Sequence, residues 1–276
     1  MKSKKLDFEK PQPHNKCKLY RYGDRYDLET KISKKNNRIG IFRKLNRNEV
    51  LNTATGEIIR CKHIKKKQEK LLFKTFKHLQ RIILANHSGK LGELLIILEY
   101  ENVPKNVYVD LKSFLAKLER RVKQKLEYIL VLQYNCMELP QYEMWTSINV
   151  DEISIDTLQD IVKECWTLGK ITIIQLNPNN IEQFSSYYIP KRNNATKLNC
   201  FPTYAKVFRT SKGIKRVIPE EMYYAEAEKI VAEYDKVFSS TKALIVNDEG
   251  KEKIIGKVSY ETYKQNKKQT EINDTS

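Results

Sequence analysis

From residue 91 onward, short apolar runs alternate along the chain with segments whose apolar residues recur every three or four positions. Four of the runs have the length of buried strands, at 93–100, 126–134, 142–150 and 170–176. The segments 104–123 and 154–168 carry apolar residues at helical spacing and predict amphipathic helices. After the fourth run, Asn177 and Pro178 predict the start of a short helix that continues to Tyr188.

The order of these elements is strand, helix, strand, strand, helix, strand, helix. It predicts an α+β fold with a repeated split βαβ unit, the ferredoxin-like arrangement. In this fold we expect an antiparallel sheet with 142–150 beside 126–134 through a hairpin. Both long helices should pack on one face of the sheet and leave the other face open.

The segments on either side of this core have different patterns. Residues 16–62 predict short strands, including a hairpin in VLNTATGEIIR that turns at Thr55-Gly56. A basic amphipathic helix follows, with its end signal at Gly89. Beyond the core, we expect a helix over 219–238 and a hairpin of 243–247 with 253–259. The predicted division is a flexible arm (1–15), a basic DNA-binding extension (16–90), the ferredoxin-like core (91–191), a C-terminal basic segment, helix and hairpin (192–262), and a disordered tail (263–276).

The charge of the chain is unevenly distributed. Its 51 Lys and Arg against 34 Asp and Glu give a net charge of +17. Residues 1–90 hold 25 basic and 8 acidic residues, whereas residues 91–276 hold 26 of each. The segment 191–217 has eight basic residues and no acidic one. This pattern favours a polyanionic partner, since Lys and Arg contacts to phosphate release counterions. Nucleic acid fits it better than a merely solvated basic face or an anionic membrane.

Other features narrow the class of protein. The five cysteines are scattered with no CxxC pair, which argues against a zinc ribbon, a redox motif or a disulfide framework. No run reaches the roughly 18 to 20 uncharged apolar residues of a membrane span. The residues MKSKKLDFEK lack the apolar run of a secretory signal. We therefore expect a cytoplasmic protein with no membrane partner.

A set of short motifs occurs in a meaningful order along the chain: LNTATGEII, LLIILEYENVPKNVYVDLKSFLAKLERR, YILVLQY, WTLGKITII, SSYYIPK and KVFRTSKGIKR. With these motifs, residues 50–222 resemble the rolling-circle replication initiators of small plasmids and filamentous phages. Those proteins belong to the histidine-hydrophobe-histidine nicking endonucleases. In that family, two histidines that flank a hydrophobic residue on a central strand hold a divalent metal, Mg²⁺ or Mn²⁺. A tyrosine on a following helix attacks a DNA phosphodiester and forms a phosphotyrosine link.

The resemblance assigns the nucleophile to Tyr188, with Tyr187 as the rival. Lys191 follows three residues later and would hold the scissile phosphate. Tyr188 also falls on the apolar stripe of its helix, so a position in the core is the alternative.

The resemblance also assigns the positions of the metal ligands, but the residues at those positions differ from the family's ligands. Met144 and Thr146, on either side of Trp145, stand where the family has its histidines, and Gln133 stands where it often has an acidic ligand. A thioether, a hydroxyl and an amide are poor ligands for Mg²⁺ or Mn²⁺. Glu138 and Glu143 are possible substitutes, although Glu143 should face away from Met144 and Thr146, because side chains alternate along a strand.

The leading hypothesis is a replication initiator that binds origin DNA, single-stranded or hairpin at the nick site, works with the host replication machinery, and nicks through Tyr188 if a metal is held. The alternatives are a non-catalytic DNA-binding replication or copy-control protein on the same scaffold, and an RNA-binding protein of the RNA-recognition fold. The predicted DNA contacts are Lys65, Lys66, Lys67, Lys74, Lys77, Arg81, Arg192, Lys206, Arg209, Lys212, Lys215 and Arg216.

Overall fold

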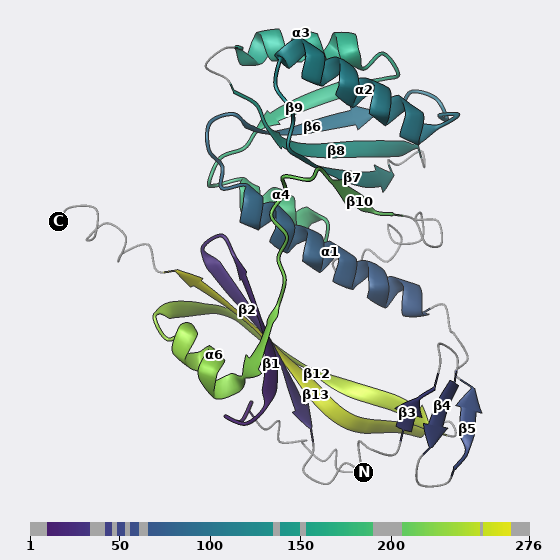
Figure 1. Cartoon of the computed structure of the whole chain (residues 1–276), viewed down its shortest axis with the longest axis vertical. Helices are drawn as coiled ribbons and strands as arrows, with labels where there is room; N and C mark the ends of the chain where they lie inside the picture. The colour runs from purple at the N-terminus through teal and green to yellow at the C-terminus, as the bar shows by residue number, and fades with distance from the viewer. Residues whose placement is uncertain are drawn as a thin grey trace, which may run out of the picture. The chain divides into compact units, whose positions relative to one another are not determined.

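A computed structural model describes the chain in two compact units (Figure 1). The central unit is 65–216, and the terminal unit combines 1–64 with 217–276. The described residues are 10–33, 42–45, 49–52, 56–60, 66–134, 139–149, 153–189, 206–248 and 251–265. Both units contain antiparallel sheet and helix, so the α+β class is confirmed.

The central unit is built on a five-stranded antiparallel sheet with the strand order β10-β7-β8-β6-β9. Strand β8 pairs with β7 in the predicted hairpin arrangement, and β6 lies between β8 and β9. The elements of this unit are α1 (Lys66–Asn86), β6 (Glu93–Glu99), α2 (Val107–Val122), β7 (Tyr128–Tyr134), β8 (Pro140–Ser147), α3 (Ile155–Cys165), β9 (Ile171–Gln175), α4 (Ile181–Tyr187) and β10 (Phe208–Thr210).

Helices cover both faces of this sheet, as Figure 1 shows. On one face, α2 and α3 pack on Leu94, Ile96 and Leu98 of β6. On the other face, α1 and α4 pack around Leu95 and Trp145. The prediction that α2 and α3 share a face is confirmed, but the prediction that the other face is open is wrong. The apolar stripe of α1, assigned above to a DNA-binding extension, is the core-facing side of a helix that closes this sheet.

Local signals set the ends of these helices. The Asn106 side chain accepts from the Tyr108 and Val109 amides at the start of α2, and Ser154 accepts from Thr157 at the start of α3. Gly89 follows α1 with a φ of +83° and lies so close to the Asn177 carbonyl that a Cβ would come within 2.2 Å of it. The loop after α1 is therefore packed tightly against the start of the α4 segment.

The terminal unit has a five-stranded antiparallel sheet of order β11-β1-β2-β13-β12, with α6 packed on one face. A separate three-stranded sheet, β3-β4-β5, contains the predicted hairpin, in which β4 pairs with β5. The elements are β1 (Lys16–Tyr22), β2 (Arg25–Ser33), β3 (Phe42–Lys44), β4 (Glu49–Asn52), β5 (Ile58–Arg60), β11 (Glu220–Tyr223), α6 (Tyr224–Ile230), β12 (Tyr234–Asp248) and β13 (Lys251–Gln265).

Two expectations about the C-terminal part differ from this structure. The helix predicted over 219–238 is reduced to α6, because 220–223 pairs with β1 and β12 begins at Tyr234. Aromatic residues such as Tyr234 and Phe238 favour strand pairing once a partner strand is present. The hairpin predicted at 243–247 and 253–259 exists but is longer, since its strands extend over 234–248 and 251–265.

The grouping into units also differs from the predicted linear division. Strand β2 pairs with β13, so segments from the two ends of the sequence share one sheet. No helix among the described residues has both the length and the apolar character of a membrane span.

Candidate functional site

Tyr188 lies immediately after α4, where the chain leaves the helix on the second face of the central sheet. Its side chain is only 4% exposed, whereas that of the rival Tyr187 is 62% exposed. The helix begins after a turn in which Asn177 accepts from the amides of Asn179 and Asn180. This turn and the burial of Ile181 direct the last turn of α4, and with it Tyr188, into the core.

The Tyr188 hydroxyl is engaged on both sides by residues of β8. It donates a short hydrogen bond to Oε2 of Glu143 and accepts one from Nε1 of Trp145 at 2.8 Å. The other carboxylate oxygen, Oε1 of Glu143, accepts from Nε2 of Gln141 at 3.2 Å. The tyrosine, the carboxylate, the indole and the amide therefore form one hydrogen-bonded chain, which we call the tyrosine cluster.

This environment keeps the phenol protonated. Burial raises the pKa of Tyr188 well above its ordinary value, and the neighbouring Glu143 carboxylate raises it further. A phenolate at this position would lose its hydration and face a negative charge. The hydroxyl is thus a hydrogen-bond donor in this arrangement rather than a prepared nucleophile.

Met144 and Thr146, which the resemblance placed at the metal-ligand positions, point away from Tyr188. Met144 is buried in the cluster that α2 and α3 form on the opposite face of the sheet. Thr146 lies two residues along the same strand, and its hydroxyl donates to the Glu127 carbonyl at 2.9 Å. The prediction that both side chains point towards Tyr188 is wrong by one residue of register, since Glu143 and Trp145 hold that position.

The remaining predicted ligands are only partly described. Gln133 pairs with Gln141, and Val131 pairs with Glu143, so Gln133 is on the face of Tyr188 as predicted. Glu138 and the predicted phosphate contact Lys191 lie outside the described residues. The donor set around Tyr188 does not fit Mg²⁺ or Mn²⁺, because an indole N–H cannot coordinate a metal and Glu143 is the one carboxylate in the cluster. In the described part of the chain, no three His, Cys, Asp or Glu side chains converge.

His87 is a buried residue beside the tyrosine cluster that sequence reasoning missed. It follows α1, is 4% exposed, and its ring centroid lies 5.9 Å from that of Trp145. Neither ring nitrogen has a hydrogen-bond partner among the described residues. Burial lowers the pKa of His87, and the Glu93 carboxylate opposes this shift in part. A signal was available in its spacing, since His87 extends the apolar stripe of α1 four residues beyond Ile83.

Glu93 holds the loop that joins α1 to the sheet. Its Oε2 accepts hydrogen bonds from the backbone amides of Ser88, Gly89 and Lys90, at 2.9, 2.6 and 3.1 Å. A carboxylate that is 6% exposed is satisfied here by three donors from one turn. The end of α1 is therefore firmly fixed on β6.

Two basic segments that are far apart in the sequence meet at one edge of the central unit. Asn86 donates to the Lys215 carbonyl at 2.9 Å and accepts from the Lys215 amide at 2.8 Å. Nearby, the rings of His78 and Phe208 lie 6.3 Å apart, and β10 pairs with β7. We call α1 together with residues 206–216 the basic edge.

The predicted DNA contacts are distributed unequally over this edge. Six of them are exposed: Lys74, Lys206, Arg209, Lys212, Lys215 and Arg216. Lys77 is half-buried, and Arg81 is only 6% exposed, so Arg81 does not present its side chain to solvent as predicted. The guanidinium of Arg209 lies 4.7 Å from the centre of the Tyr108 ring, on the side of α2. Lys65 and Arg192 are outside the described residues, as are the side chains of Lys66 and Lys67.

Comparisons of this chain with protein-family models, with curated proteins and with solved structures found no match.

Proposed function

We propose that this chain is a DNA-binding replication initiator of the rolling-circle type that works in the cytoplasm and binds origin duplex through the basic edge. In this proposal Tyr188 keeps the position of the family's nucleophile, but the tyrosine cluster is closed and does not cut DNA by the imidazole and metal route. The function then rests on binding.

The observation that carries the proposal is the meeting of α1 with residues 206–216. The central unit holds 25 Lys and Arg against 15 Asp and Glu, and five of the exposed basic residues lie within 206–216. A helix of 21 residues is about 30 Å long, close to one turn of duplex DNA. Lys74 of α1 and the five exposed basic residues of 206–216 place several cations on one edge, which favours contacts with the phosphates of a duplex.

Two features support the initiator plan. The first is the strand order β9-β6-β8-β7 with α2 and α3 on one face, which is the order we expect of a split βαβ, ferredoxin-like unit. The second is the pair Glu143 and Trp145, which flank one hydrophobic residue on a central strand and face the tyrosine that follows β9. The resemblance placed the histidine positions one residue farther along, at Met144 and Thr146, and in this proposal they move to Glu143 and Trp145.

The RNA-recognition alternative has less support in the central unit. That fold binds bases on an exposed sheet face with aromatic side chains. Here α1 and α4 cover the face that would be needed, and Trp145 is fully buried beneath them.

Duplex binding by variants of the full chain tests the proposal. We expect the triple variant Lys212→Ala, Lys215→Ala, Arg216→Ala to lower duplex affinity and to reduce the slope of log affinity against log salt by about 2.7. The matched control is Lys112→Ala, Lys117→Ala, Lys163→Ala, which removes the same charge from exposed residues of α2 and α3. Equal losses in both variants would show that net charge alone drives binding and would contradict the proposal.

The cutting activity is tested separately with supercoiled plasmid that carries the cognate origin. We expect no Mn²⁺-dependent nicked circles and no covalent protein–DNA band from the wild-type chain. Robust nicking that Tyr188→Phe abolishes would overturn the closed-cluster part of the proposal and leave duplex binding by the basic edge intact.

A further inference from the structure

The five-stranded sheet of the terminal unit has two unlike faces. Helix α6 packs on the face that includes Cys17, Leu19 and Leu28. Because side chains alternate along a strand, the opposite face carries Lys16 and Lys18 of β1. Lys16 is paired there with Tyr223, and Lys18 is paired with Glu29. Within the described part of this unit, no helix packs on this second face.

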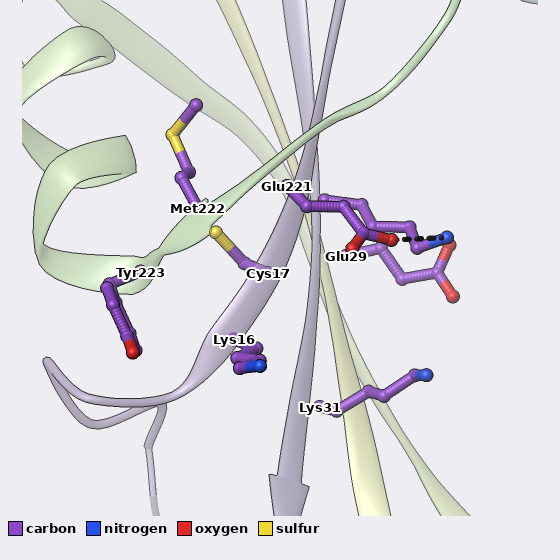
Figure 2. Close-up of a pocket in the computed structure, with 8 residues that line it drawn as sticks. Lys16, Cys17, Glu29, Lys31, Glu221, Met222 and Tyr223 are labelled. Atoms are coloured by element: carbon purple, nitrogen blue, oxygen red, sulfur yellow. Dashed lines mark ion pairs between the residues drawn. The ribbon is translucent and has the colours of Figure 1, made fainter.

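A pocket opens at one end of this face, as Figure 2 shows. Its volume is about 400 Å³, within the range of small-molecule sites. Three lysines contribute to its lining, and they differ in their pairing. Lys18 forms an ion pair with Glu221 at 3.2 Å, whereas no ion pair of Lys16 or Lys31 is found among the described residues.

Aromatic side chains lie among these lysines. Tyr223 is 50% exposed and is paired with Lys16 across β11 and β1. Farther across the sheet, the ammonium of Lys242 lies 5.6 Å from the centre of the Tyr260 ring. Lys31 of β2 pairs with Val258 of β13, which pairs with Lys242 of β12, so this row carries lysines with Tyr223 at its β11 end.

The other end of the same face is closed. Asp27 is 2% exposed, and its carboxylate accepts from the hydroxyls of Tyr22 and Thr262 at 2.9 and 2.7 Å. The carboxylate there is satisfied inside the protein. Lys16 and Lys31 line the pocket together with Tyr223 and with the carboxylates of Glu29 and Glu221.

We propose that this face binds single-stranded nucleic acid, with one base stacked on Tyr223 and the adjoining phosphates held by Lys16 and Lys31. Stacking on an exposed ring requires a base that is not already stacked in a duplex. Lys16 is the cross-strand partner of Tyr223, so it places a cation beside the ring for an adjoining phosphate. The site is distinct from the basic edge and does not depend on the proposed origin binding.

Binding of a fluorescent oligo-dT of about 12 nucleotides to the full chain tests this site. We expect Tyr223→Ala to weaken binding by about 5- to 150-fold, the range for loss of one stacked base, and Tyr223→Phe to restore it. The double variant Lys16→Ala, Lys31→Ala should lower the salt slope by about 1.4. Its charge-matched control, Lys112→Ala with Lys229→Ala, removes exposed lysines of α2 and α6 and should leave the affinity unchanged.

Duplex affinity measured on the same proteins shows whether each variant is folded and separates this proposal from the previous one. A Tyr223→Ala protein that keeps duplex binding and oligo-dT binding alike would overturn the stacking site. Loss of oligo-dT binding in the control double variant to the same extent as in Lys16→Ala, Lys31→Ala would also overturn it. Comparison with oligo-U identifies the source of the strand: equal affinity supports a site for either nucleic acid, and preference for oligo-dT supports a site for DNA.

Discussion

The two five-stranded antiparallel sheets of this protein are buried to different extents. In the central unit, α1 and α4 cover one face and α2 and α3 the other, so Trp145 and Met144 are both fully buried on adjacent positions of β8. In the terminal unit, α6 covers one face and leaves Lys16, Lys31 and Tyr223 at the surface. A sheet closed on both sides can offer only its edges to a macromolecule, whereas a half-covered sheet can offer a face.

The largest effect is expected from a substitution that tests whether α1 belongs to the core of the central unit. Phe76 is 2% exposed on the inner side of α1. We expect Phe76→Ala to lower the free energy of unfolding by about 3–5 kcal/mol, because it removes a buried ring and leaves a cavity. The control Lys74→Ala, on the exposed side of the same helix, should change it by less than about 0.5 kcal/mol. Chemical denaturation would measure the free energy of unfolding of both variants. A small effect of Phe76→Ala would show that α1 is not part of the core of the central unit.

The tyrosine cluster provides the second test, since it joins the end of α4 to β8 on the sheet face that α1 and α4 cover. Tyr188→Phe removes the donor to Glu143 and the acceptor of Trp145, which leaves buried polar groups unpaired. We expect a loss of about 1–3 kcal/mol in the free energy of unfolding. Tyr187→Phe, at an exposed position, is the matched control and should have almost no effect. A neutral Tyr188→Phe would show that the hydroxyl does not stabilise the fold.

His87 makes the stability of the closed sheet depend on pH. Because burial lowers the pKa of His87 in the folded protein, the unfolded chain binds a proton more readily as pH falls. Its contribution to stability is therefore complete above the ordinary histidine pKa of about 6.5 and is lost as pH falls through that value. We expect a decline of at most about 1.4 kcal/mol per pH unit between pH 6.5 and 5, measured by denaturation.

The substitution His87→Phe should flatten this part of the pH profile, while His14→Phe, at an exposed position, should leave it unchanged. An unaltered profile in His87→Phe would assign the pH dependence to other groups.

The smallest expected effect concerns the hydrogen bonds of Asn86 to the Lys215 backbone, which connect the two segments of the basic edge. Asn86→Ala removes both hydrogen bonds to the Lys215 backbone without altering the charge of the chain. We expect a loss of about 1 kcal/mol in stability and a few-fold loss in duplex affinity, because residues 206–216 are no longer held against α1. Asn179→Ala, at an exposed position, is the control. Unchanged duplex affinity in Asn86→Ala would mean that the two basic segments act independently.

Most elements of the central unit could be predicted from the sequence, because their signals are local. Apolar runs of strand length gave β6, β7, β8 and β9 within a few residues, and Ser154 and Gly89 marked helix ends that the structure retains. The concentration of basic residues in 1–90 and 191–217 is also a property of the sequence alone. These features depend on neighbours a few positions away, so the chain carries them in full.

Which face each residue occupies was decided only by the tertiary structure. Strand β8 is buried on both sides from Tyr142 to Thr146, so its hydrophobic pattern has no polar face that could show which side chains meet Tyr188. For the same reason the sequence could not distinguish the register of Met144 and Thr146 from that of Glu143 and Trp145.

The same limit applies to long-range pairing. The joining of Asn86 to Lys215 spans 129 residues, and the pairing of β2 with β13 brings together the two ends of the chain. The sequence by itself determined the basic stretches and most helices and strands of the central unit, whereas β11 and the start of β12 replaced part of the helix expected over 219–238. Only the folded protein decided which of them meet, because partners so far apart are selected by packing and backbone hydrogen bonds that no local pattern records.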